Sequence, residues 1–573
     1  VVFRLYRSDT LLAVVSDGIN IYDYLESNGT ITLQESHFSQ APAAVEGLTC
    51  VDEEHKSIEL QWNSTPVLTE TGYVIQRSDS GDFSTNLQEF TIGSANVQSW
   101  VDTSVVLHSD YYYRVAATND FGQSDWTALS SPAASHINTY NGGLYISANP
   151  ATVEYTHITG NLRLNGTTTD SSGLSNLVSV GGYLELNGAG IADISGLANI
   201  EEVGSYVFIY NCDSLPNLSG LSSLQTIGGY LDIRGNDNAL FTGLSGLDTL
   251  TSIGGYLLVQ DNANLTDLSG LDALASVGEH VEIGSNPSLT SLTGLGSLTS
   301  IAGRLDIRSN DAIQSLTGLS TELTHIGGAL SIYGNDSAAF TDLSGLQSIT
   351  SVGGDLDIMY ADYLGSLSGL DGLVTVGGQV YIHGNSALTS VSLPVLTSVG
   401  ESTDDDYSIY LRGQGNQPNL TSVNMPSLSN VVEGIRVHEL YGLVSIDMGA
   451  LSSIGGGLSI YNCDDLTSAD FDSLVSVGGQ LSLAHNAAWE TSAAFSSLKD
   501  IGGTLEVYTS HFSNLDFLSS LVSVNGLYIE GNTELQHIDQ LAALGSVTPL
   551  DMSGAITISD NDDILFQQLP DLS

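Results

Sequence analysis

The strongest constraint on this chain is internal repetition. From about residue 139 to residue 573 the sequence is self-similar, with a period of roughly 24 residues. The clearest unit begins at Gly254 and reads GGYLLVQDNANLTDLSGLDALASV, and the next unit begins at Gly278. Such a short unit cannot bury its apolar residues alone, so neighbouring units must stack and share one core. The repeat therefore predicts a β-solenoid of about 18 coils, with a parallel strand in each coil.

Each position in the repeat has a physical role. The paired glycines that open a unit, such as Gly228 and its successor, permit a tight bend into the strand. Because side chains alternate across a strand, Leu231 and Ile233 should point inward while Asp232 and Arg234 point outward.

An asparagine follows the inward isoleucine by three residues in most units. A buried amide ladder at this position would satisfy the backbone groups of every turn. Cys212 and Cys463 fall at the same position, which predicts small buried residues rather than catalytic or metal-binding thiols. The predicted ladder residues are Asn149, Asn236, Asn262, Asn286, Asn310, Asn335, Asn385, Asn486, Asn532 and Asn561.

The pattern L-x-x-I/V-G-G-x-L-x-I-x-x-N-x-x-L-x-x-L-x-G-L resembles receptor L domains, which are similar to leucine-rich repeats but lack long regular helices. Leu265, Leu268, Leu271 and Leu274 lie three residues apart, a spacing that favours turns or 3₁₀ segments on the side opposite the strand. The resemblance covers most of residues 139–573. It implies a binding scaffold and leaves the ligand open.

Residues 41–138 contain short alternating strands separated by turn residues, including SIELQW, GYVIQRSDS and YYYRVAATNDFGQS. This order resembles a fibronectin type III domain, a β-sandwich in which Trp62 would be the core tryptophan and Tyr111 the corner tyrosine. Residues 1–40 match the second half of the same plan, because FRLYRSDT corresponds to YVIQRSDS. They predict the C-terminal part of another such module. Its missing strands would be supplied by chain upstream or by a neighbouring subunit. The expected fold class is thus mainly β.

Charge limits the partners. The chain has 12 Lys and Arg against 65 Asp and Glu, a formal net charge of −53. Such a field repels phosphate, which excludes nucleic acid as a partner. No run of 18 apolar residues occurs, so we expect no membrane insertion within this segment. Sparse, nearly all-negative charge suits a salty extracellular or cell-surface environment that screens carboxylates.

The few basic residues of the solenoid point to one face. All its arginines occupy outward positions on the strands, and tyrosines share that face. Arg and Tyr are favoured at interface hot spots, but they are also good cross-strand neighbours for carboxylates. Two interpretations stay open: a face that binds a protein or glycan, or ladders that only stabilise the sheet. The candidate binding residues are Tyr230, Arg234, Tyr256, Arg304, Arg308, Tyr333, Tyr381, Arg412 and Arg436.

Two acidic clusters suggest metal binding. Ca²⁺ takes six to eight oxygen ligands, and clustered carboxylates can supply them. Neither cluster matches a known calcium loop, so a solvated acidic loop is the preferred interpretation. Ca²⁺ is the one cofactor under consideration. The candidate ligands are Asp404, Asp405, Asp406, Asp560, Asp562 and Asp563.

The sequence contains no G-x-S-x-G, no H-E-x-x-H, no P-loop and no carboxylate pair in a recognisable context. We therefore predict that the chain is not an enzyme. The expected function is that of an extracellular cell-surface adhesion or recognition protein, whose solenoid sheet face binds a protein or glycan partner. The alternative is a structural subunit of an extracellular filament, sheath or surface layer, which would bind copies of itself through module contacts or strand donation.

Overall fold

The computed structural model describes residues 3–7, 10–15, 41–53, 57–63, 70–105, 110–134, 139–153, 155–166, 168–402, 406–413, 419–489, 494–536, 538, 541, 544, 546–547 and 556–561. The chain divides into two compact units. One unit contains Val1–Tyr140 and Val153–His157, and the other contains Asn141–Thr152 and Ile158–Ser573. The described residues include no helix that is long and apolar enough to cross a membrane.

The N-terminal unit begins with an antiparallel hairpin of β1 (Phe3–Arg7) and β2 (Thr10–Val15). The rest of the prediction for residues 1–40, beyond this hairpin, lies outside the described residues. Two antiparallel sheets follow, in the strand orders β3-β4-β7 and β10-β8-β5-β6. The strands are β3 (Glu46–Glu53), β4 (Ser57–Asn63), β5 (Gly72–Ser78), β6 (Gln88–Ile92), β7 (Ser99–Asp102), β8 (Asp110–Asn119), β9 (Gly122–Gln123), β10 (Thr127–Ala128) and β11 (Ala133–Ala134).

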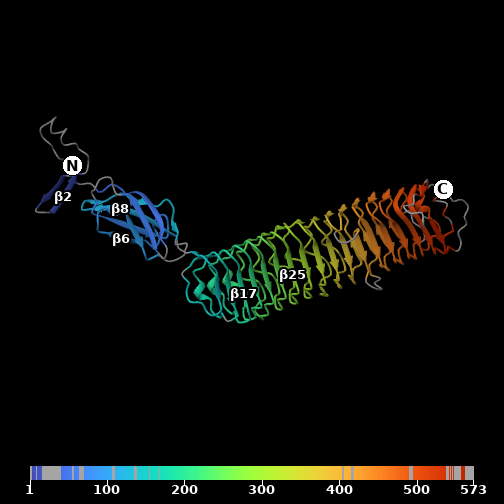
Figure 1. Cartoon of the computed structure of the whole chain (residues 1–573), viewed down its shortest axis with the longest axis horizontal. Coiled ribbons are helices and arrows are strands. Elements are labelled where there is room, and N and C mark those ends of the chain that lie inside the picture. The colour runs from blue at the N-terminus through green and yellow to red at the C-terminus, as the bar shows by residue number, and fades with distance from the viewer. Residues whose placement is uncertain are drawn as a thin grey trace, which may run out of the picture. The chain divides into compact units, whose positions relative to one another are not determined.

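One apolar core joins these two sheets (Figure 1). Trp62 is buried in it, as predicted, and its ring lies 5.3 Å from that of Tyr73. Tyr111 is also buried. At one edge, the buried Asp102 accepts hydrogen bonds from Arg77 Nη1 at 2.6 Å and from the Tyr113 hydroxyl at 2.9 Å. A carboxylate inside this core is thus paired and hydrogen-bonded, as burial of a charge requires.

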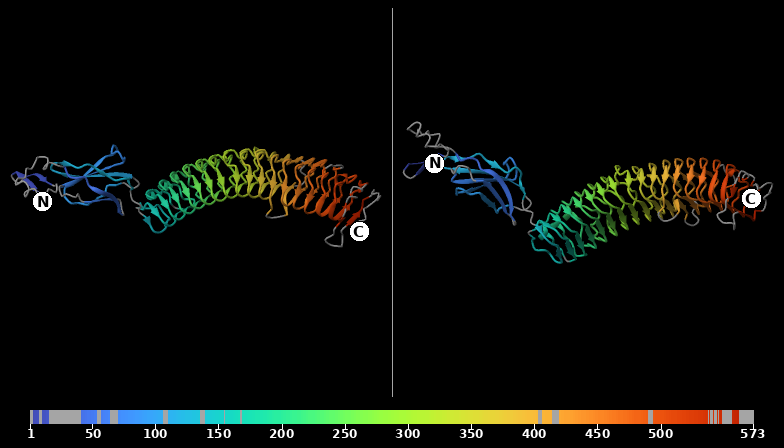
Figure 2. Two further views of the ribbon diagram at one scale, coloured as in Figure 1. Left: turned by 90° about the horizontal axis from the view of Figure 1, so that it is seen from above. Right: turned by 45° about the horizontal axis from the view of Figure 1, so that its top comes forward.

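The second unit is a long parallel β-solenoid, whose coils stack along its length (Figures 1 and 2). Each coil contributes a short strand and then a strand of mostly four residues, and each kind pairs in parallel with its equivalent in the next coil. The register is regular: Leu231 faces Val207 on one side and Leu257 on the other. The predicted parallel solenoid is confirmed at this level.

Two rows of strands make up this sheet, which has 34 strands in the described part of the chain. The short row consists of β12 (Thr139–Tyr140), β14 (His157–Ile158), β16 (Ser179–Val180), β18 (Glu202–Val203), β20 (Thr226–Ile227), β22 (Ser252–Ile253), β24 (Ser276–Val277), β26 (Ser300–Ile301), β28 (His325–Ile326), β30 (Ser351–Val352), β32 (Thr375–Val376), β35 (Ser398–Val399), β38 (Asn430–Val431), β41 (Ser453–Ile454), β44 (Ser476–Val477) and β48 (Ser546–Val547).

The second row carries the outward side chains of interest. It consists of β13 (Leu144–Ile146), β15 (Leu162–Asn165), β17 (Leu184–Asn187), β19 (Val207–Tyr210), β21 (Leu231–Arg234), β23 (Leu257–Gln260), β25 (Val281–Gly284), β27 (Leu305–Arg308), β29 (Leu330–Tyr333), β31 (Leu356–Met359), β33 (Val380–His383), β36 (Tyr407–Arg412), β39 (Gly434–His438), β42 (Leu458–Tyr461), β45 (Leu481–Ala484) and β49 (Ile556–Ser559). Two longer strands, β46 (Asp500–Tyr508) and β47 (Ser523–Glu530), run through both rows.

The wall opposite the sheet has little regular structure. As the leucine spacing predicted, it contains 3₁₀ turns, namely η2 (Ser172–Leu174), η3 (Ser195–Leu197), η4 (Ser219–Leu221) and η5 (Asp516–Leu518). A second parallel sheet contains β34 (Ser390–Ser392), β37 (Ser422–Asn424), β40 (Ser445–Asp447) and β43 (Ser468–Asp470).

The glycine pairs mark the bend between the two rows. At this bend successive coils approach so closely that a Cβ on Gly254 would overlap the carbonyl oxygen of Gly228 in the preceding coil. Gly278 has the same relation to Gly254. Glycine is therefore required here for close backbone approach between coils as well as for the bend itself.

The asparagine ladder is confirmed in the central coils. Asn262 Nδ2 donates to the Ile233 carbonyl at 3.0 Å, and its backbone N–H donates to Asn286 Oδ1 at 3.1 Å. Cys212 and Cys463 are buried at the same position, and their N–H groups donate to Asn236 and Asn486. Burial raises the pKa of both thiols to about 12.

Asn149 departs from the ladder prediction. It is exposed, and its Oδ1 accepts the backbone N–H groups of Thr169 at 2.8 Å and Asp170 at 3.0 Å. The amide therefore serves an exposed turn. The reason is its place at the first coil of the unit, where it lacks the covering that neighbouring coils give the interior asparagines.

Candidate binding face

The outward residues of the second strand row form three parallel columns along the solenoid. The first column is the residue before each strand, the second is the second strand residue, and the third is the fourth strand residue. In one coil these are Tyr230, Asp232 and Arg234, and in the next they are Tyr256, Leu258 and Gln260. We call this surface the outer sheet face. The nine candidate binding residues all belong to it.

A stack of aromatic rings fills the first column over five coils. Successive ring centroids are 4.4 to 4.7 Å apart, and the ring planes differ by 3° to 14°. This spacing follows from the distance between parallel strands, about 4.8 Å. The rings, which we call the ring column, are those of Tyr183, Tyr206, Tyr230, Tyr256 and His280.

Stacking determines what the ring column can present. The two faces of Tyr206, Tyr230 and Tyr256 are covered by neighbouring rings, so these residues offer edges and hydroxyls. Burial and the neighbouring Tyr256 raise the pKa of Tyr230 to about 12, which keeps the phenol protonated. Burial and the charge of Arg304 lower the pKa of His280. A ligand that needs an open ring face finds none on these three tyrosines.

The predicted arginines are mostly paired within the sheet. Arg304 Nη2 lies 2.9 Å from Glu282 Oε2, and Arg308 also donates to Glu282. Burial raises the pKa of Glu282, but hydrogen bonds from Arg308 and Arg304 outweigh it, and the net shift is downward. Burial and the charge of Glu282 raise the pKa of Asp306. The group is a cross-strand ion network of the kind that stabilises a sheet.

Asp232 corrects the simple inside–outside assignment. It stands on the outward side, as predicted, yet it is fully buried. In the register it lies between Phe208 and Leu258, and Arg234 Nη2 approaches its Oδ2 at 2.7 Å. Burial raises the pKa of Asp232. Period-2 alternation gives the direction of a side chain, but the size of its cross-coil neighbours decides its exposure.

A second aromatic group covers the coils from β29 to β47, and most of its rings are not parallel. Tyr381 and Tyr410 are 5.2 Å apart at 32°, whereas Tyr461 and Tyr508 each meet His485 edge-on. Tyr333 is 40% exposed. These rings are less completely covered by one another than those of the ring column, so this half of the face can offer ring surface to a ligand.

Arg412 and Arg436 belong to this second group and differ in their partners. Arg412 Nε lies 3.0 Å from Glu439 Oε2. Arg436 instead lies over the Tyr407 ring, with its Cζ 4.0 Å from the ring centroid, and its Nη2 donates to the Tyr407 hydroxyl at 3.0 Å. Among the described arginines of the solenoid, Arg436 alone has no carboxylate within ion-pair distance.

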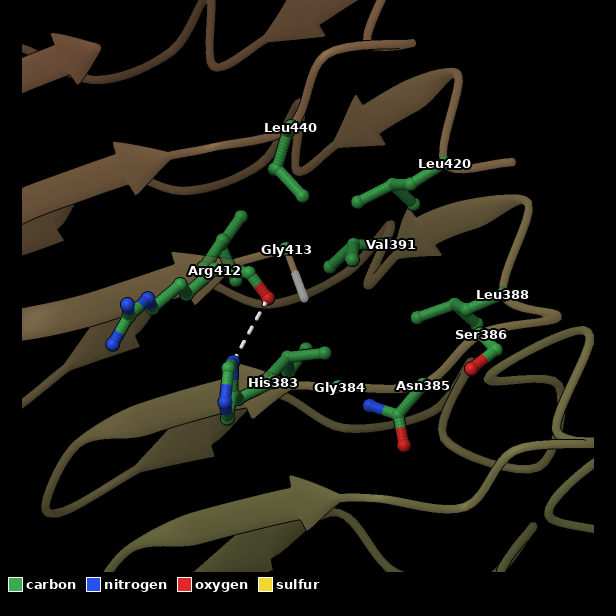
Figure 3. A pocket seen from close by; sticks show the side chains of 12 residues that line it. His383, Gly384, Asn385, Ser386, Leu388, Val391, Arg412, Gly413, Leu420 and Leu440 are labelled. Atoms are coloured by element: carbon green, nitrogen blue, oxygen red, sulfur yellow. Dashed lines mark hydrogen bonds between the residues drawn. The ribbon is translucent and has the colours of Figure 1, made fainter. Parts of the chain in front are cut away.

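A cavity of about 20 Å³, enough for roughly one water, lies where the ladder is interrupted. Figure 3 shows His383 and Arg412 on one side of it and the side chains of Leu388, Leu420 and Leu440 around the other. The His383 ring contacts the Arg412 carbonyl at 3.3 Å. The residues that follow its lining residue Gly413 in the sequence, 414–418, lie outside the described residues, and we assign no ligand to this cavity.

Two open hollows lie along the bend between the strand rows. The larger, about 530 Å³, is lined mainly by glycine, serine and the ends of short strands from Glu202 to Ala302. The other, about 410 Å³, is lined by Asp406, Tyr407, Val432, Glu433, Gly455, Gly456, Gly457, Gly479 and Gln480. The sequence predicted neither hollow. The run Gly455–Gly457, with glycine in place of the first-column side chain, is the signal that could have located the second.

Two of the six calcium candidates lie among the described residues. Asp404, Asp405, Asp562 and Asp563 lie outside the described residues. Asp406 and Asp560 are both exposed. No group of three or more metal-binding side chains occurs in the part of the chain that the structure describes. Calcium binding and the absence of enzyme activity both stay predictions.

No protein-family model matches the chain, and no curated protein matches it. Among solved structures, titin domains match with 18% identity and a TM-score of 0.15, covering 17% of this chain and 32% of the titin chain, about a third of its length. A fibronectin type III-like protein from Clostridium thermocellum matches with 24% identity and a TM-score of 0.14, over 17% of this chain and 100% of its own.

A pectate lyase from Pectobacterium carotovorum matches the solenoid, with 12% identity and a TM-score of 0.13, over 63% of this chain and 92% of its own. All three TM-scores are far below 0.5. The similarities therefore assign no family, substrate or activity to this chain.

Proposed function

We propose that this chain is an extracellular cell-surface protein for adhesion or recognition, and that its outer sheet face binds a protein or glycan partner. The N-terminal sandwich would be a fibronectin type III-like spacer, and the solenoid would be of the receptor L-domain type. The asparagine ladder and the 3₁₀ turns opposite the sheet support that type.

The observation that carries the proposal is segregation of side-chain types. The arginines and most of the tyrosines of the solenoid share one face. Elsewhere the solenoid surface is dominated by Ser, Thr, Gly and Asp. Arg and Tyr supply large contact area at low entropic cost, which is why they concentrate at interfaces. A long face with shallow hollows suits an extended macromolecular partner better than a small substrate, which needs a deep pocket.

The test is binding of the labelled chain to an array of oligosaccharides and to immobilised extracellular-matrix proteins. The variant Tyr333→Ser removes an exposed ring from the face, and Tyr363→Ser removes a ring that is 49% exposed but lies in a turn outside the strand columns. We expect Tyr333→Ser, combined with Tyr381→Ser, to weaken binding by about tenfold, and Tyr363→Ser to leave it unchanged. Equal loss in both would refute a role for this face.

A second candidate is a structural subunit of a filament, sheath or surface layer. The observation in its favour is that the ring column and the Glu282 network satisfy their groups within the chain, as a self-supporting scaffold requires. Long ordered polymers of the purified protein in negative-stain micrographs would decide for this candidate. A monodisperse monomer at high concentration would count against it.

A further inference from the structure

The second hollow lies at a local departure from the repeat. The strand β36 is out of register with β39: Tyr407 pairs with Gly434, but the next pair is Ile409 with Ile435. Ser408 is the extra residue; it is fully buried, and its hydroxyl accepts the Glu433 N–H at 2.8 Å. Bulges of this kind re-aim a side chain and recur beside binding sites. Here the bulge brings the Tyr407 ring beside Gly434.

The first column has glycine in two consecutive coils at this point, Gly434 and Gly457. A Cβ on Gly434 would lie 2.7 Å from Tyr407 Cδ1, so the tyrosine ring occupies the space that a side chain would need. Gly457 is different, because the three atoms nearest to an added Cβ all belong to Gln480, with the carbonyl oxygen at 3.0 Å and the side-chain Cγ at 3.5 Å, and none belongs to an aromatic ring. The ring that other coils place here is missing, and the hollow takes its place.

The hollow combines the groups that recognise a sugar ring. Tyr407 provides an aromatic wall, Gln480 an amide, and Asp406 and Glu433 provide carboxylates that accept hydroxyl protons. Arg436 lies outside the lining of the hollow and holds the Tyr407 ring in place: its Cζ is 4.0 Å from the ring centroid, and its Nη2 donates to the Tyr407 hydroxyl.

From these contacts we infer that the hollow formed by Tyr407, Gly457 and Gln480 binds one neutral hexose unit of a glycan, with Arg436 positioning the Tyr407 ring. This inference rests on the proposed recognition function and names the ligand class and its place on the outer sheet face. Charge selects a neutral ligand over an acidic one. Asp406 and Glu433 line the hollow, no Lys or Arg is among its described lining residues, and the chain as a whole carries −53, so a uronate or sulfated glycan would be repelled.

Two variants test the site by opposite means. Gly457→Tyr restores the ring that Tyr230 and Tyr256 supply at the same position of their coils, and so fills the hollow. Arg436→Met keeps the length and apolar stem of the side chain but removes the guanidinium. The matched control is Ala329→Tyr, which adds the same ring at the same column position away from the hollow.

The probe is an array of neutral hexose and N-acetylhexosamine oligomers beside uronate oligomers of equal length. We expect the native chain to bind neutral oligomers only, both site variants to lose about tenfold or more in affinity, and Ala329→Tyr to stay within about twofold. Retained affinity in Arg436→Met and in a folded Gly457→Tyr overturns the site but leaves the recognition function intact. Preference for uronates, or binding to matrix proteins without any glycan, overturns the ligand class. If the native chain binds neither the oligosaccharides of the array nor the immobilised matrix proteins, both the site and the recognition function are overturned.

Discussion

Replacing one interior ladder asparagine should open the solenoid locally, and the structure gives the size of the effect. Asn286 is fully buried. Its Nδ2 donates to the carbonyls of Val259 at 3.0 Å and Gly284 at 2.9 Å, and its Oδ1 accepts the N–H of Asn262 at 3.1 Å. The same oxygen also accepts Asn262 Nδ2 at 3.2 Å, and Asn286 Nδ2 donates to Asn310 Oδ1 at 3.3 Å. The variant Asn286→Ala removes all five bonds and leaves the Asn262 N–H buried without its partner.

The cost follows from these contacts. An orphaned buried donor costs about 1–3 kcal/mol, and each of the two lost carbonyl bonds costs about 1 kcal/mol, so the total is about 3–5 kcal/mol. The matched control is Asn264→Ala in the preceding coil, because that half-buried side chain makes one bond, to the Asp237 carbonyl at 3.0 Å. Its loss should cost about 1 kcal/mol or less.

Amide hydrogen exchange is the suitable assay, because a long repeat array need not unfold in a single two-state step. We expect the protection of the Asn262 amide in Asn286→Ala to fall by about 100-fold or more, since each 1.4 kcal/mol is a factor of ten. Exchange in distant coils should change little. Unchanged protection at Asn262, or an equal loss in Asn264→Ala, would refute the argument that the ladder amides hold neighbouring coils together.

Three other perturbations have defined outcomes. Gly254→Ala should lower the melting temperature, because its Cβ overlaps the Gly228 carbonyl, whereas Gly296→Ala, whose Cβ would meet only an oxygen 3.9 Å away, should not. Burial and the charge of Arg436 lower the pKa of His438 from 6.5 to about 4, so the unfolded chain binds the proton more readily. Stability should therefore fall as the pH falls from 6.5 to 4, and thermal melts of His438→Gln should lack this component. A thiol reagent should label the exposed Cys50 of the native chain but not Cys212 or Cys463, whose pKa values are raised to about 12.

The results that would contradict these expectations are equally specific. Identical melting temperatures for the two glycine variants would mean that the bend relaxes without cost. If the difference in melting temperature between the native chain and His438→Gln does not change from pH 6.5 to 4, the imidazole is hydrated and its pKa is not lowered by burial. Labelling of three thiols in the native state, read by intact mass, would mean that the ladder opens readily.

Much of the fold could be predicted from the sequence, because it rests on local pattern. The alternation of Leu231 and Ile233 with outward residues, the glycine pairs and the ladder asparagines recur in register from coil to coil. When every unit repeats the same pattern, one strand register satisfies all units at once, and a slip would expose every leucine. Burial of Trp62 in the N-terminal sandwich was likewise expected, from the resemblance of its segment to a fibronectin type III domain.

The candidate site was less predictable, because it depends on residues brought together by stacking. Arg304 and Arg308 were expected on the face, but their pairing with Glu282 depends on which coils become neighbours. The burial of Asp232 depends likewise on Phe208 and Leu258.

Sequence alone thus determined that this chain forms stacked coils with an inward apolar ladder and an outward Arg and Tyr face. The period of about 24 residues along the chain specifies the stacking of coils, and the period of 2 along each strand specifies which side chains point inward and which point outward. Tertiary structure decided which groups on that face are available. Ring faces in the ring column are covered because parallel strands hold them one strand spacing apart. Arg436 is left without a carboxylate because its neighbours in the adjoining coils are Tyr410 and Ser459. Whether a side chain on the outer sheet face can contact a ligand thus depends on which residues the stacking places beside it in the neighbouring coils, and on their sizes.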